Sequence, residues 1–478
     1  MKSFIKLHDN DNVMIALTDL PSGTQLGEVT LKEDISQGHK IALTDISAGA
    51  DVLKDNFAIG QATAAIEAGT HVHSHNIASQ FEEADMKYEP KLREKFSLLM
   101  DREIRVYHRK NWEIGIRNEL WILPTVGHCN KMAQFIKERF LKEVSKLEVD
   151  GVHAFEHPHG CFQVGEDLDS TRKILQNLAL HPNTGGVLVL GLGTESNNTE
   201  SFRNSLGDFD PERIHFMDAQ NLENEIEAGV QHLHELHAKM KQDYRSTSLL
   251  RQLKIGLKYG EFDSMTAVTT SPLLSALSDY MVRSGGYVAT TGIQHLAQSS
   301  EELLSRIENE EAFLKVKGMT QSLKIPTQHV PENQGISTLK ERSLGYFKKI
   351  GTSNIVDVVS YGDRLKKSGV NLVESPSHDL IGATALGAAG CQMVLYVTSH
   401  GTPIGTFVPT LKIATNTELA KNKPNWVDYD SEASLASTPE EAIEDFIGYI
   451  CDVASGKWVK NEYEGYREIA IWKRGETL

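Results

Sequence analysis

From Gly115 onward, short aliphatic runs alternate with segments of amphipathic helical pattern, and this alternation restricts the fold more than any other feature. Several runs lead into loops that contain glycine, as buried strands of an α/β sheet do. The expected strands cover residues 120–123, 152–155, 187–192, 254–257, 287–290, 372–374 and 393–397. We therefore predict an α/β region with Rossmann-like parallel sheets over residues 103–478, and a division into two subdomains near residue 250 stays open.

The last expected helix has recognisable ends. Thr438 precedes Pro439, and Glu441 follows, which is the pattern of an N-cap with proline at the first helical position. Apolar residues then recur at helical spacing up to Gly456. This pattern predicts a structural helix.

The first eighty residues contain a weak internal repeat, in which an aliphatic residue lies three positions before a glycine and a new extended run follows. The copies cover residues 16–24, 42–50 and 65–70. Strand, turn and strand in succession predict a small, mostly β domain over residues 1–76. Residues 77–102 lose this pattern and become charged, so we expect a linker that is partly helical after Pro90. A hairpin over residues 104–115 would then lead into the large region.

The last extended run of the β domain carries three histidines, His71, His73 and His75. If the run is a strand, alternation places the three imidazoles on one face. Neutral imidazole is a common metal ligand and carries protons near neutral pH, so the run predicts a metal site or an acid/base site. The alternative is a surface strand with solvated histidines. His39 lies in another expected turn and could add a fourth ring.

Composition excludes several classes of partner. The 478-residue chain has a net charge of -16, which argues against a nucleic acid or an anionic membrane as partner. Residues 1–6 lack the apolar segment of a signal peptide, and no apolar run reaches membrane-spanning length, so we expect a cytoplasmic protein. The four cysteines are too scattered for a disulfide framework, and no Cys-x-x-Cys zinc pattern occurs.

Ligands of open α/β sheets bind beyond the carboxyl ends of the strands, so the loops there form the candidate site. The loops with reactive or charged side chains cover residues 156–161, 191–195, 259–263, 398–402 and 412–416. Glycine in such loops is commonly turn chemistry, and Gly191-Leu-Gly193 without a full fingerprint is weak evidence for a dinucleotide. Arg117 and Lys412 are either surface cations or, among small polar residues, holders of a carboxylate.

These motifs, in this order and spacing, resemble the altronate/galactarate dehydratase family, in which an N-terminal SAF domain is joined to a large lyase domain. The match extends over nearly the whole chain, and the Val-His-Ser-His-Asn and Lys-Ile-Ala-Thr-Asn runs are its most specific parts. The matching stretches are residues 38–43, 69–76, 115–118, 123–126, 181–187, 191–195, 352–358 and 409–416.

The resemblance implies an enzyme that removes water from a sugar acid such as altronate or galactarate, giving a 2-keto-3-deoxy acid. It also implies a divalent metal, Fe²⁺ or Mn²⁺, as cofactor. Such a metal would stabilise the developing enediolate, while a base removes the C2 proton and an acid assists the departing C3 hydroxyl. The partner would be the small-molecule sugar acid, and we expect a homo-oligomer.

Carried over to this sequence, the resemblance gives particular residues a role. The metal ligands would be His71, His73, His75, His157, Cys161 and Glu195. The catalytic residues would be His73, His75, Lys412 and Asp263. The substrate would contact Arg117, Asn118, Asn76, Thr415 and Asn416. The small β domain would then dock on the α/β region so that its histidines meet Arg117, Glu195 and Lys412.

Several family motifs differ here, so the chain resembles a divergent member. Thr194 and Tyr259 stand where the family has cysteines, and Cys161 remains, so we do not expect a metal or cluster held by several thiolates. A Glu-Thr-Pro-Glu segment is lost near residues 289–294, and His400 replaces an arginine. Two alternatives therefore stay open: a related lyase that eliminates sulfite from a sulfonated hydroxy-acid, and a catalytically inactive sugar-acid binding paralogue.

Overall fold

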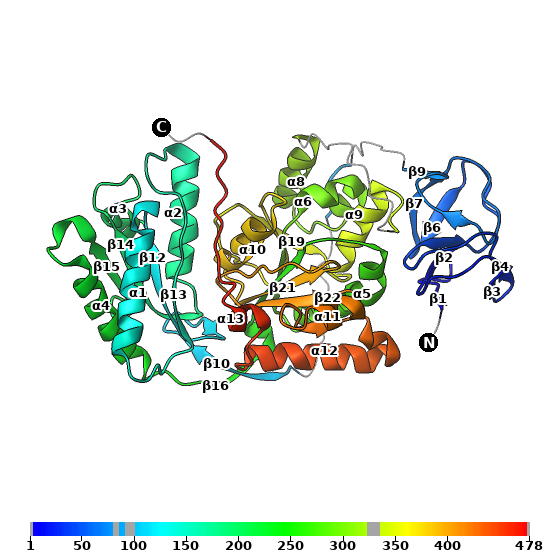
Figure 1. Cartoon of the computed structure of the whole chain (residues 1–478). Helices are drawn as coiled ribbons and strands as arrows, with labels where there is room; N and C mark the ends of the chain where they lie inside the picture. Colours follow the sequence, from blue (N-terminus) through cyan, green and yellow to red (C-terminus); the bar gives the residue numbers. More distant parts are fainter. Residues whose placement is uncertain (1–2, 80–85, 91–100, 323–334, 476–478) are drawn as a thin grey trace.

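The computed structural model describes residues 3–79, 86–90, 101–322 and 335–475. Three parts lie in a row (Figure 1). The N-terminal domain (residues 3–79) is at one end, the second domain (residues 103–249) is at the other, and the third domain (residues 250–475) lies between them. The N-terminal domain is built of strands and the rest is mixed α/β, which confirms the predicted fold class. The helix predicted after Pro90 falls outside the described residues.

The internal repeat builds the N-terminal domain. Gly23, Gly49 and Gly69 each adopt a positive φ, between 80° and 84°, at the turn of their repeat. Glycine enters this region of backbone space without a steric penalty. Ile46 and Ile66, which precede two of these glycines, are buried and form a β-bridge with each other. The predicted strand-turn-strand pattern is therefore confirmed.

The strands of this domain form one four-stranded antiparallel sheet and two smaller sheets. The last strand, β9, pairs with β7 and brings two residues of the predicted linker into the domain. The strands are β1 Phe4–Ile5, β2 Val13–Ala16, β3 Gln25–Leu26, β4 Val29–Thr30, β5 Lys40–Ala42, β6 Asp51–Lys54, β7 Phe57–Ala62, β8 His71–Val72 and β9 Ile77–Ala78.

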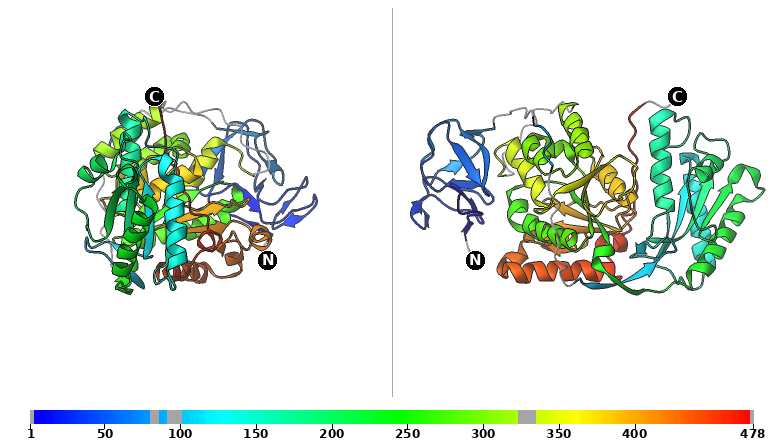
Figure 2. Two further views of the ribbon diagram at one scale, coloured as in Figure 1. Left: turned by 60° about the vertical axis from the view of Figure 1, so that its left-hand side comes forward. Right: turned by 180° about the vertical axis from the view of Figure 1, so that it is seen from behind.

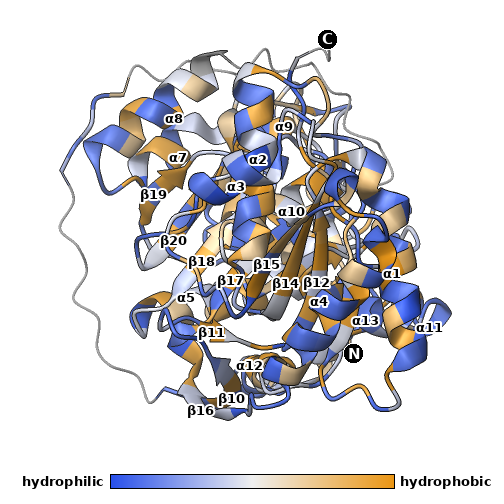
Figure 3. Ribbon diagram, turned by 90° about the vertical axis from the view of Figure 1, so that its left-hand side faces the viewer, coloured by the Kyte–Doolittle hydropathy of each residue, from blue (hydrophilic) through white to orange (hydrophobic). Residues whose placement is uncertain are grey.

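The second domain has four parallel strands in the order β13-β12-β14-β15, so β15 is an edge strand. Residues of β12 alternate between the faces: Leu120 and Ile122 pack with α1 and α4, whereas Trp121 and Leu123 pack with α2. Figure 3 shows these apolar strands behind helices whose outer sides are hydrophilic. The elements are β12 Glu119–Pro124, α1 Asn130–Glu143, β13 Gly151–Ala154, α2 Gly165–Ala179, β14 Thr184–Gly191, α3 Thr199–Asn204, β15 Ile214–Asp218 and α4 Glu225–Met240.

Seven parallel strands form the sheet of the third domain, in the order β19-β20-β18-β17-β21-β22-β23. Helices α5 and α12 pack on one face, where Figure 2 shows α12 from behind, and α10 packs on the other. The strands are β17 Lys254–Tyr259, β18 Tyr287–Thr290, β19 Ile355–Val359, β20 Gly369–Val373, β21 Met393–Thr398, β22 Thr410–Ala414 and β23 Tyr429–Asp430. The helices are α5 Ser264–Arg283, α6 Ile293–Leu296, α7 Ser300–Ser305, α8 Glu310–Ser322, α9 Leu339–Lys348, α10 Asp379–Ala388, α11 Thr417–Asn422, α12 Pro439–Ala454 and α13 Lys460–Glu464.

Each of the seven predicted strands and the predicted last helix are found. Thr438 caps α12 and Glu441 completes the capping box. The predicted hairpin is also found, and it joins a further strand in the sheet β11-β10-β16. These strands are β10 Glu103–His108, β11 Ile114–Gly115 and β16 Ser246–Leu249. Short 3-10 helices cover Gly127–Cys129, Ala219–Asn221, Leu250–Gln252, Ala297–Ser299 and Ala433–Ala436.

Residues 86–90 of the predicted linker pack on the third domain. The Tyr88 hydroxyl donates to the carbonyl of Glu308 at 2.8 Å, and the Tyr88 ring meets the edge of Phe313. In the described part of the chain, none of the helices combines the length and the apolar character that crossing a membrane requires.

Candidate active site

The predicted histidine strand is shorter than expected, because β8 ends at Val72 and residues 73–76 turn. His73 and His75 therefore lie outside the strand, and alternation along a strand does not determine where the three imidazole rings lie. Asn76 closes the turn: its side-chain oxygen accepts from the amide of His73 at 2.9 Å, and its amide nitrogen donates to the carbonyl of His71 at 2.8 Å. The turn brings His75 back toward His71, with the ring centroids 5.5 Å apart.

His39 completes a cluster of four imidazoles, as the sequence suggested. Its ring centroid lies 4.9 Å from that of His71 and 5.2 Å from that of His73. Nδ1 of His39 and Nε2 of His71 are 2.8 Å apart, so one of these nitrogens carries the shared proton. We call His39, His71, His73 and His75 the imidazole cluster.

Three members of the imidazole cluster, His39, His71 and His73, have a lowered pKa and are therefore neutral near pH 7. Burial, followed by the neighbouring His39, lowers the pKa of His71 to about 3. Burial, followed by the ammonium of Lys40, lowers the pKa of His73 to about 4, and both causes also lower the pKa of His39. Neutral imidazole is the form that binds metals and accepts protons.

The donor chemistry of the imidazole cluster suits a divalent transition metal. Nε2 of His73 is buried and has no hydrogen-bond partner among the described residues. The ring nitrogens do not converge on one point in this conformation. Of the residues described, the one group of three His, Cys, Asp or Glu side chains with ligand atoms within 4.8 Å of one another lies in the second domain.

The N-terminal domain docks on α9 of the third domain. Nζ of Lys40 lies 3.0 Å and Nζ of Lys54 lies 2.6 Å from the carboxylate of Glu341, and all three side chains are buried. Burial alone would raise the pKa of Glu341, but the two ammonium groups outweigh it and lower that pKa to about 2. Leu344 of α9 packs into the apolar core of the N-terminal domain.

The same contact places the imidazole cluster beside the carboxyl end of β17. Gly38, next to His39, packs against the side chains of Ser264 and Met265, which begin α5 directly after the loop that follows β17. From α9, the Tyr346 ring stacks on His295 with centroids 4.6 Å apart. The imidazole cluster therefore lies near the start of α5, which follows the carboxyl edge of the seven-stranded sheet.

At this edge, three polar side chains form a row across adjacent strands. Lys258 of β17 is in register with Tyr396 of β21, and Tyr396 is in register with Lys412 of β22. Asp379, the first residue of α10, joins two of them. It lies 2.8 Å from Nζ of Lys258 and accepts from the Tyr396 hydroxyl at 2.9 Å. We call Lys258, Tyr396 and Lys412 the cross-strand row.

Lys412 is the distinctive member of the cross-strand row. Its side chain is buried, and among the described residues its Nζ has no hydrogen-bond partner. It lies 5.3 Å from the centre of the Tyr466 ring. Burial lowers the pKa of Lys412 to about 8, so a large share of this amine is neutral at mildly alkaline pH. A buried amine of this kind can act as a base.

Further polar groups border the row. The Glu261 carboxylate accepts from the hydroxyl of Thr398 at 2.9 Å, and the hydroxyl of Ser399 contacts Nδ1 of His400 at 2.9 Å. Nδ2 of Asn416 donates to the carbonyl of Ser399. The hydroxyls of Thr291 and Thr415 are buried without a partner in the part of the chain that the structure describes. Buried polar atoms of this kind are available to a ligand.

Three family models match consecutive parts of the chain. The SAF domain of altronate/galactarate dehydratases matches residues 2–80. The second domain of D-galactarate dehydratase/altronate hydrolase matches residues 106–241, and the C-terminal part of D-galactarate/altronate dehydratase matches residues 250–477. The chain belongs to the altronate/galactarate dehydratase family. The predicted identity as an enzyme of the hydro-lyase type is thereby confirmed.

Three dehydratases match this chain along nearly their whole length. The altronate dehydratase of Escherichia coli (strain K12) is 44% identical over 99% of this chain and 100% of its own. The altronate dehydratase of Bacillus subtilis (strain 168) is 40% identical over 100% of both chains. The galactarate dehydratase (L-threo-forming) of E. coli (strain K12) is 30% identical over 95% of this chain and 93% of its own.

The structure does not bring all predicted site residues of this family member together. His157, Cys161 and Glu195 lie in the second domain, at the opposite end of the molecule from the N-terminal domain (Figure 1). Nε2 of His157 lies 2.7 Å from the carbonyl of Pro124, and Glu195 accepts from the backbone amide of Gly193 at 2.7 Å. Their role as metal ligands stays a prediction, but within one chain they do not join the imidazole cluster.

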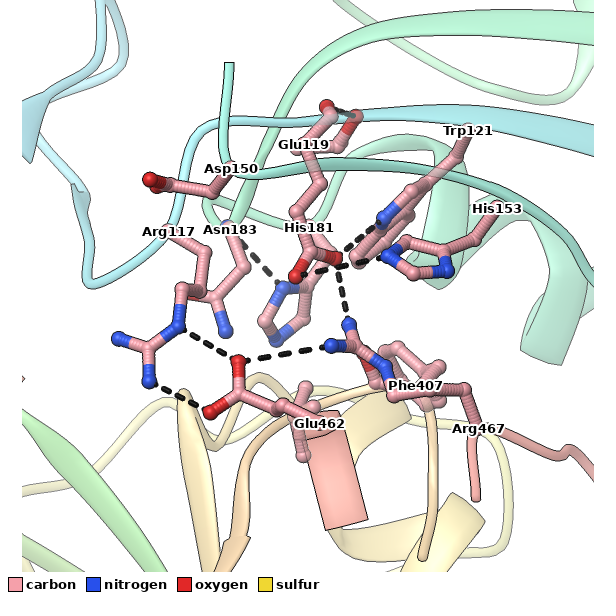
Figure 4. Close-up of polar contacts among 12 residues, drawn as sticks. Arg117, Glu119, Trp121, Asp150, His153, His181, Asn183, Phe407, Glu462 and Arg467 are labelled. Atoms are coloured by element: carbon pink, nitrogen blue, oxygen red, sulfur yellow. Dashed lines mark hydrogen bonds and ion pairs between the residues drawn. The ribbon is translucent and has the colours of Figure 1, made fainter. Parts of the chain in front are cut away.

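The docking partner of the N-terminal domain also differs from the sequence prediction. That prediction has the domain meeting Arg117, Glu195 and Lys412 together, whereas it packs on α9 and the start of α5. Arg117 lies in the joint between the second and third domains (Figure 4). There its guanidinium makes two bonds to Glu462, at 2.6 and 2.7 Å, and its side chain is fully buried.

The joint in Figure 4 is a buried ionic network. Arg467 pairs with Glu119, which also accepts from the Trp121 ring nitrogen at 2.8 Å. Asn118, the neighbour of Arg117, accepts from Arg109 at 3.0 Å. Substrate contacts by Arg117 and Asn118 stay predictions. In this structure, Arg117 binds Glu462 of the third domain and Asn118 binds Arg109.

Asp263, Thr415 and Asn416 are closer to the cross-strand row. Asp263 caps α5 by accepting from the amide of Thr266 at 2.7 Å, and Asn416 caps α11. Sequence reasoning missed Lys258, Asp379 and Tyr396. Lys258 left a weak signal, because it is a charged residue inside an apolar strand, but its partners are distant in the sequence.

Proposed function

We propose that this chain removes water from an aldonic acid, with altronate as the first candidate, and forms a 2-keto-3-deoxy acid. The observation that supports this most is identity of 44% and 40%, over essentially the full length, to two altronate dehydratases. Differences at the carboxyl edge, such as Tyr259 and His400, are the reason to test other aldonic and aldaric acids as well.

The reaction needs a base and a positive charge at the substrate carboxylate. Removing the proton beside a carboxylate places negative charge on that carboxylate, and buried cations stabilise such charge strongly. Lys258 supplies a fixed ammonium, held by Asp379. Lys412 has no such partner among the described residues and has a pKa lowered to about 8, so we assign it to accept the C2 proton.

We propose that a divalent metal, Fe²⁺ or Mn²⁺, is held by His71, His73 and His75. Support comes from the lowered pKa values of His71 and His73, which keep these two imidazoles neutral, and from the buried, unpartnered Nε2 of His73 in the described structure. A bound metal would polarise the substrate's carboxylate and hydroxyl groups. Asn76 orients the turn that carries these rings through its bonds to His71 and His73.

The test is a substrate panel with the metal-loaded, full-length protein. Aldonic and aldaric acids are supplied with Mn²⁺ or Fe²⁺, and 2-keto-3-deoxy product is measured. We expect turnover with altronate or a related aldonate. Folded, metal-loaded protein without turnover on any acid would contradict the proposal.

Two further measurements distinguish the alternatives. Sulfite released from a sulfonated hydroxy-acid, without keto-deoxy product from the sugar acids, would identify the related lyase. Tight binding of a sugar acid by calorimetry, without turnover, would identify a binding paralogue.

A further inference from the structure

We propose that His215, His232 and Glu235 form a second divalent-metal site, at the outer edge of the second domain. The site is independent of the proposed dehydration. Figure 1 shows its elements, β15 and α4, at the end of the molecule farthest from the N-terminal domain and its imidazole cluster. The three side chains are the described group whose ligand atoms lie within 4.8 Å of one another.

The fold brings the two histidines together. His215 is on the edge strand β15, on the same side as Met217, which packs against α4. His232 lies on α4 next to its buried face, and Glu235 follows one turn later. Two residues three apart on a helix face the same side, so His232 and Glu235 both reach toward His215.

The distances suit a shared ion. Nδ1 of His215 and Nδ1 of His232 are 3.0 Å apart, and each lies 3.9 Å from Oε2 of Glu235. Two nitrogen ligands about 2.0–2.1 Å from one zinc ion, at angles between roughly 90° and 109°, are about 2.9–3.4 Å apart. The imidazole pair is therefore preset, and the exposed carboxylate needs only a small rotation to close on the ion.

The carboxylate is available for this movement. Its other oxygen, Oε1, accepts from the side chain of Gln231 at 3.1 Å, which leaves Oε2 directed at the histidines. Glu235 is 51% exposed, and His215 and His232 are 19% and 32% exposed, so an ion can enter from solvent. Two imidazoles and one carboxylate are a ligand set for Zn²⁺ and similar divalent metals, with a further position open to water.

Without an ion, the pair of Nδ1 atoms can share one proton in a hydrogen bond. A bound ion would replace this proton and link the edge strand β15 to α4. Because the two histidines belong to different elements, the ion binds the folded domain far better than the unfolded chain, and zinc should raise the unfolding temperature.

The experiment titrates Zn²⁺ alone into chelator-treated, full-length protein and counts the bound equivalents by calorimetry. We expect the variant H215Q/H232Q to lose one equivalent relative to the unchanged chain. The matched control is H234Q, because His234 lies on the same helix but faces Glu143 at 3.2 Å and the Phe140 ring. The control should keep every equivalent.

The imidazole cluster could bind zinc as well, so H71Q/H73Q is titrated in parallel. Loss of a different equivalent in that variant supports two separate sites. An unchanged number of equivalents in H215Q/H232Q, with circular dichroism like that of the unchanged chain, overturns the proposal. Should H215Q/H232Q fail to fold, the exposed variant E235Q decides. At least tenfold weaker binding of one equivalent supports the site, and unchanged affinity overturns it.

Discussion

The ammonium nitrogen of Lys40 lies 3.0 Å from a carboxylate oxygen of Glu341, across the contact between the N-terminal and third domains. Lys54 reaches the other oxygen of the same carboxylate at 2.6 Å. One buried carboxylate thus pairs with two buried amines, and the imidazole cluster is carried on the domain that this triad anchors. The anchor explains why residues on a small β domain can serve a site on an α/β domain.

Replacing Glu341 with glutamine should loosen the docked N-terminal domain. The variant leaves Lys40 and Lys54 buried without a counter-ion, and removing one partner of a buried pair costs about 3–5 kcal/mol. We expect the first transition in differential scanning calorimetry to move to a lower temperature and the activity to fall. The transition temperature of the rest of the protein should stay the same.

A matched control for this variant is E444Q. Glu444 pairs with Arg102, but its side chain is 66% exposed, and exposed pairs contribute about 0–1 kcal/mol. Equal unfolding curves for E341Q and E444Q would show that the triad does not hold the domains together.

Replacing His73 with alanine should remove bound metal and activity together. His73 is the buried member of the imidazole cluster whose Nε2 lacks a partner in the described residues. Elemental analysis after dialysis and a dehydration assay give the two readouts. H8A is the control, because His8 is an exposed histidine of the same domain. Full metal content in H73A would reject the proposed role of His73, whatever its activity.

The parts of the fold with a local signal could be predicted from the sequence. Capped, periodic α12 and the aliphatic strands follow from residues that are neighbours in the chain. β22 was not predicted, because Lys412 interrupts its apolar run, and Asp357 does the same in β19. Lys412 is buried because the tertiary structure surrounds it, whereas Asp357 is partly exposed and pairs with Lys367 at 3.2 Å.

Only part of the candidate site could be predicted from the sequence. The histidine run and Lys412 stand out as motifs, whereas Lys258 and Tyr396 meet only through the order of strands in the sheet. Glu341 gave no signal, since its role depends on a domain contact. The turn at Asn76 was also missed, because a strand and a turn can both follow His71-Val72.

Lys412 should give the enzyme a characteristic pH dependence. Its pKa is lowered to about 8, and the proposed base is the neutral amine. The value of kcat/KM should therefore rise as the pH increases and level off above pH 8. K412R keeps its charge at every pH, so we expect a loss of roughly 10²–10⁴-fold, as for other general bases.

The same variant separates the two roles of this lysine. If Lys412 instead holds the substrate carboxylate, K412R should retain much of the activity, and the rate of the unchanged chain should fall as the pH rises through about 8. That result would contradict the proposed base. Circular dichroism of K412R controls for misfolding of the buried strand.

Acid should weaken the joint between the second and third domains through His181. Nδ1 of His181 accepts from the amide of Asn183, and Nε2 donates to the carbonyl of Cys391 at 3.2 Å, so the buried ring is neutral. Burial, followed by the charge of Arg364, lowers the pKa of His181 to about 3.

In the unfolded chain, His181 binds a proton near pH 6.5. The stability that the neutral, buried ring contributes is therefore complete above pH 6.5 and is lost as the pH falls toward 3. The free energy of unfolding is measured with urea at several pH values. Its slope against pH should be about 1.4 kcal/mol per pH unit smaller in H181Q than in the unchanged chain. Parallel pH profiles of the two proteins would show that His181 is not responsible.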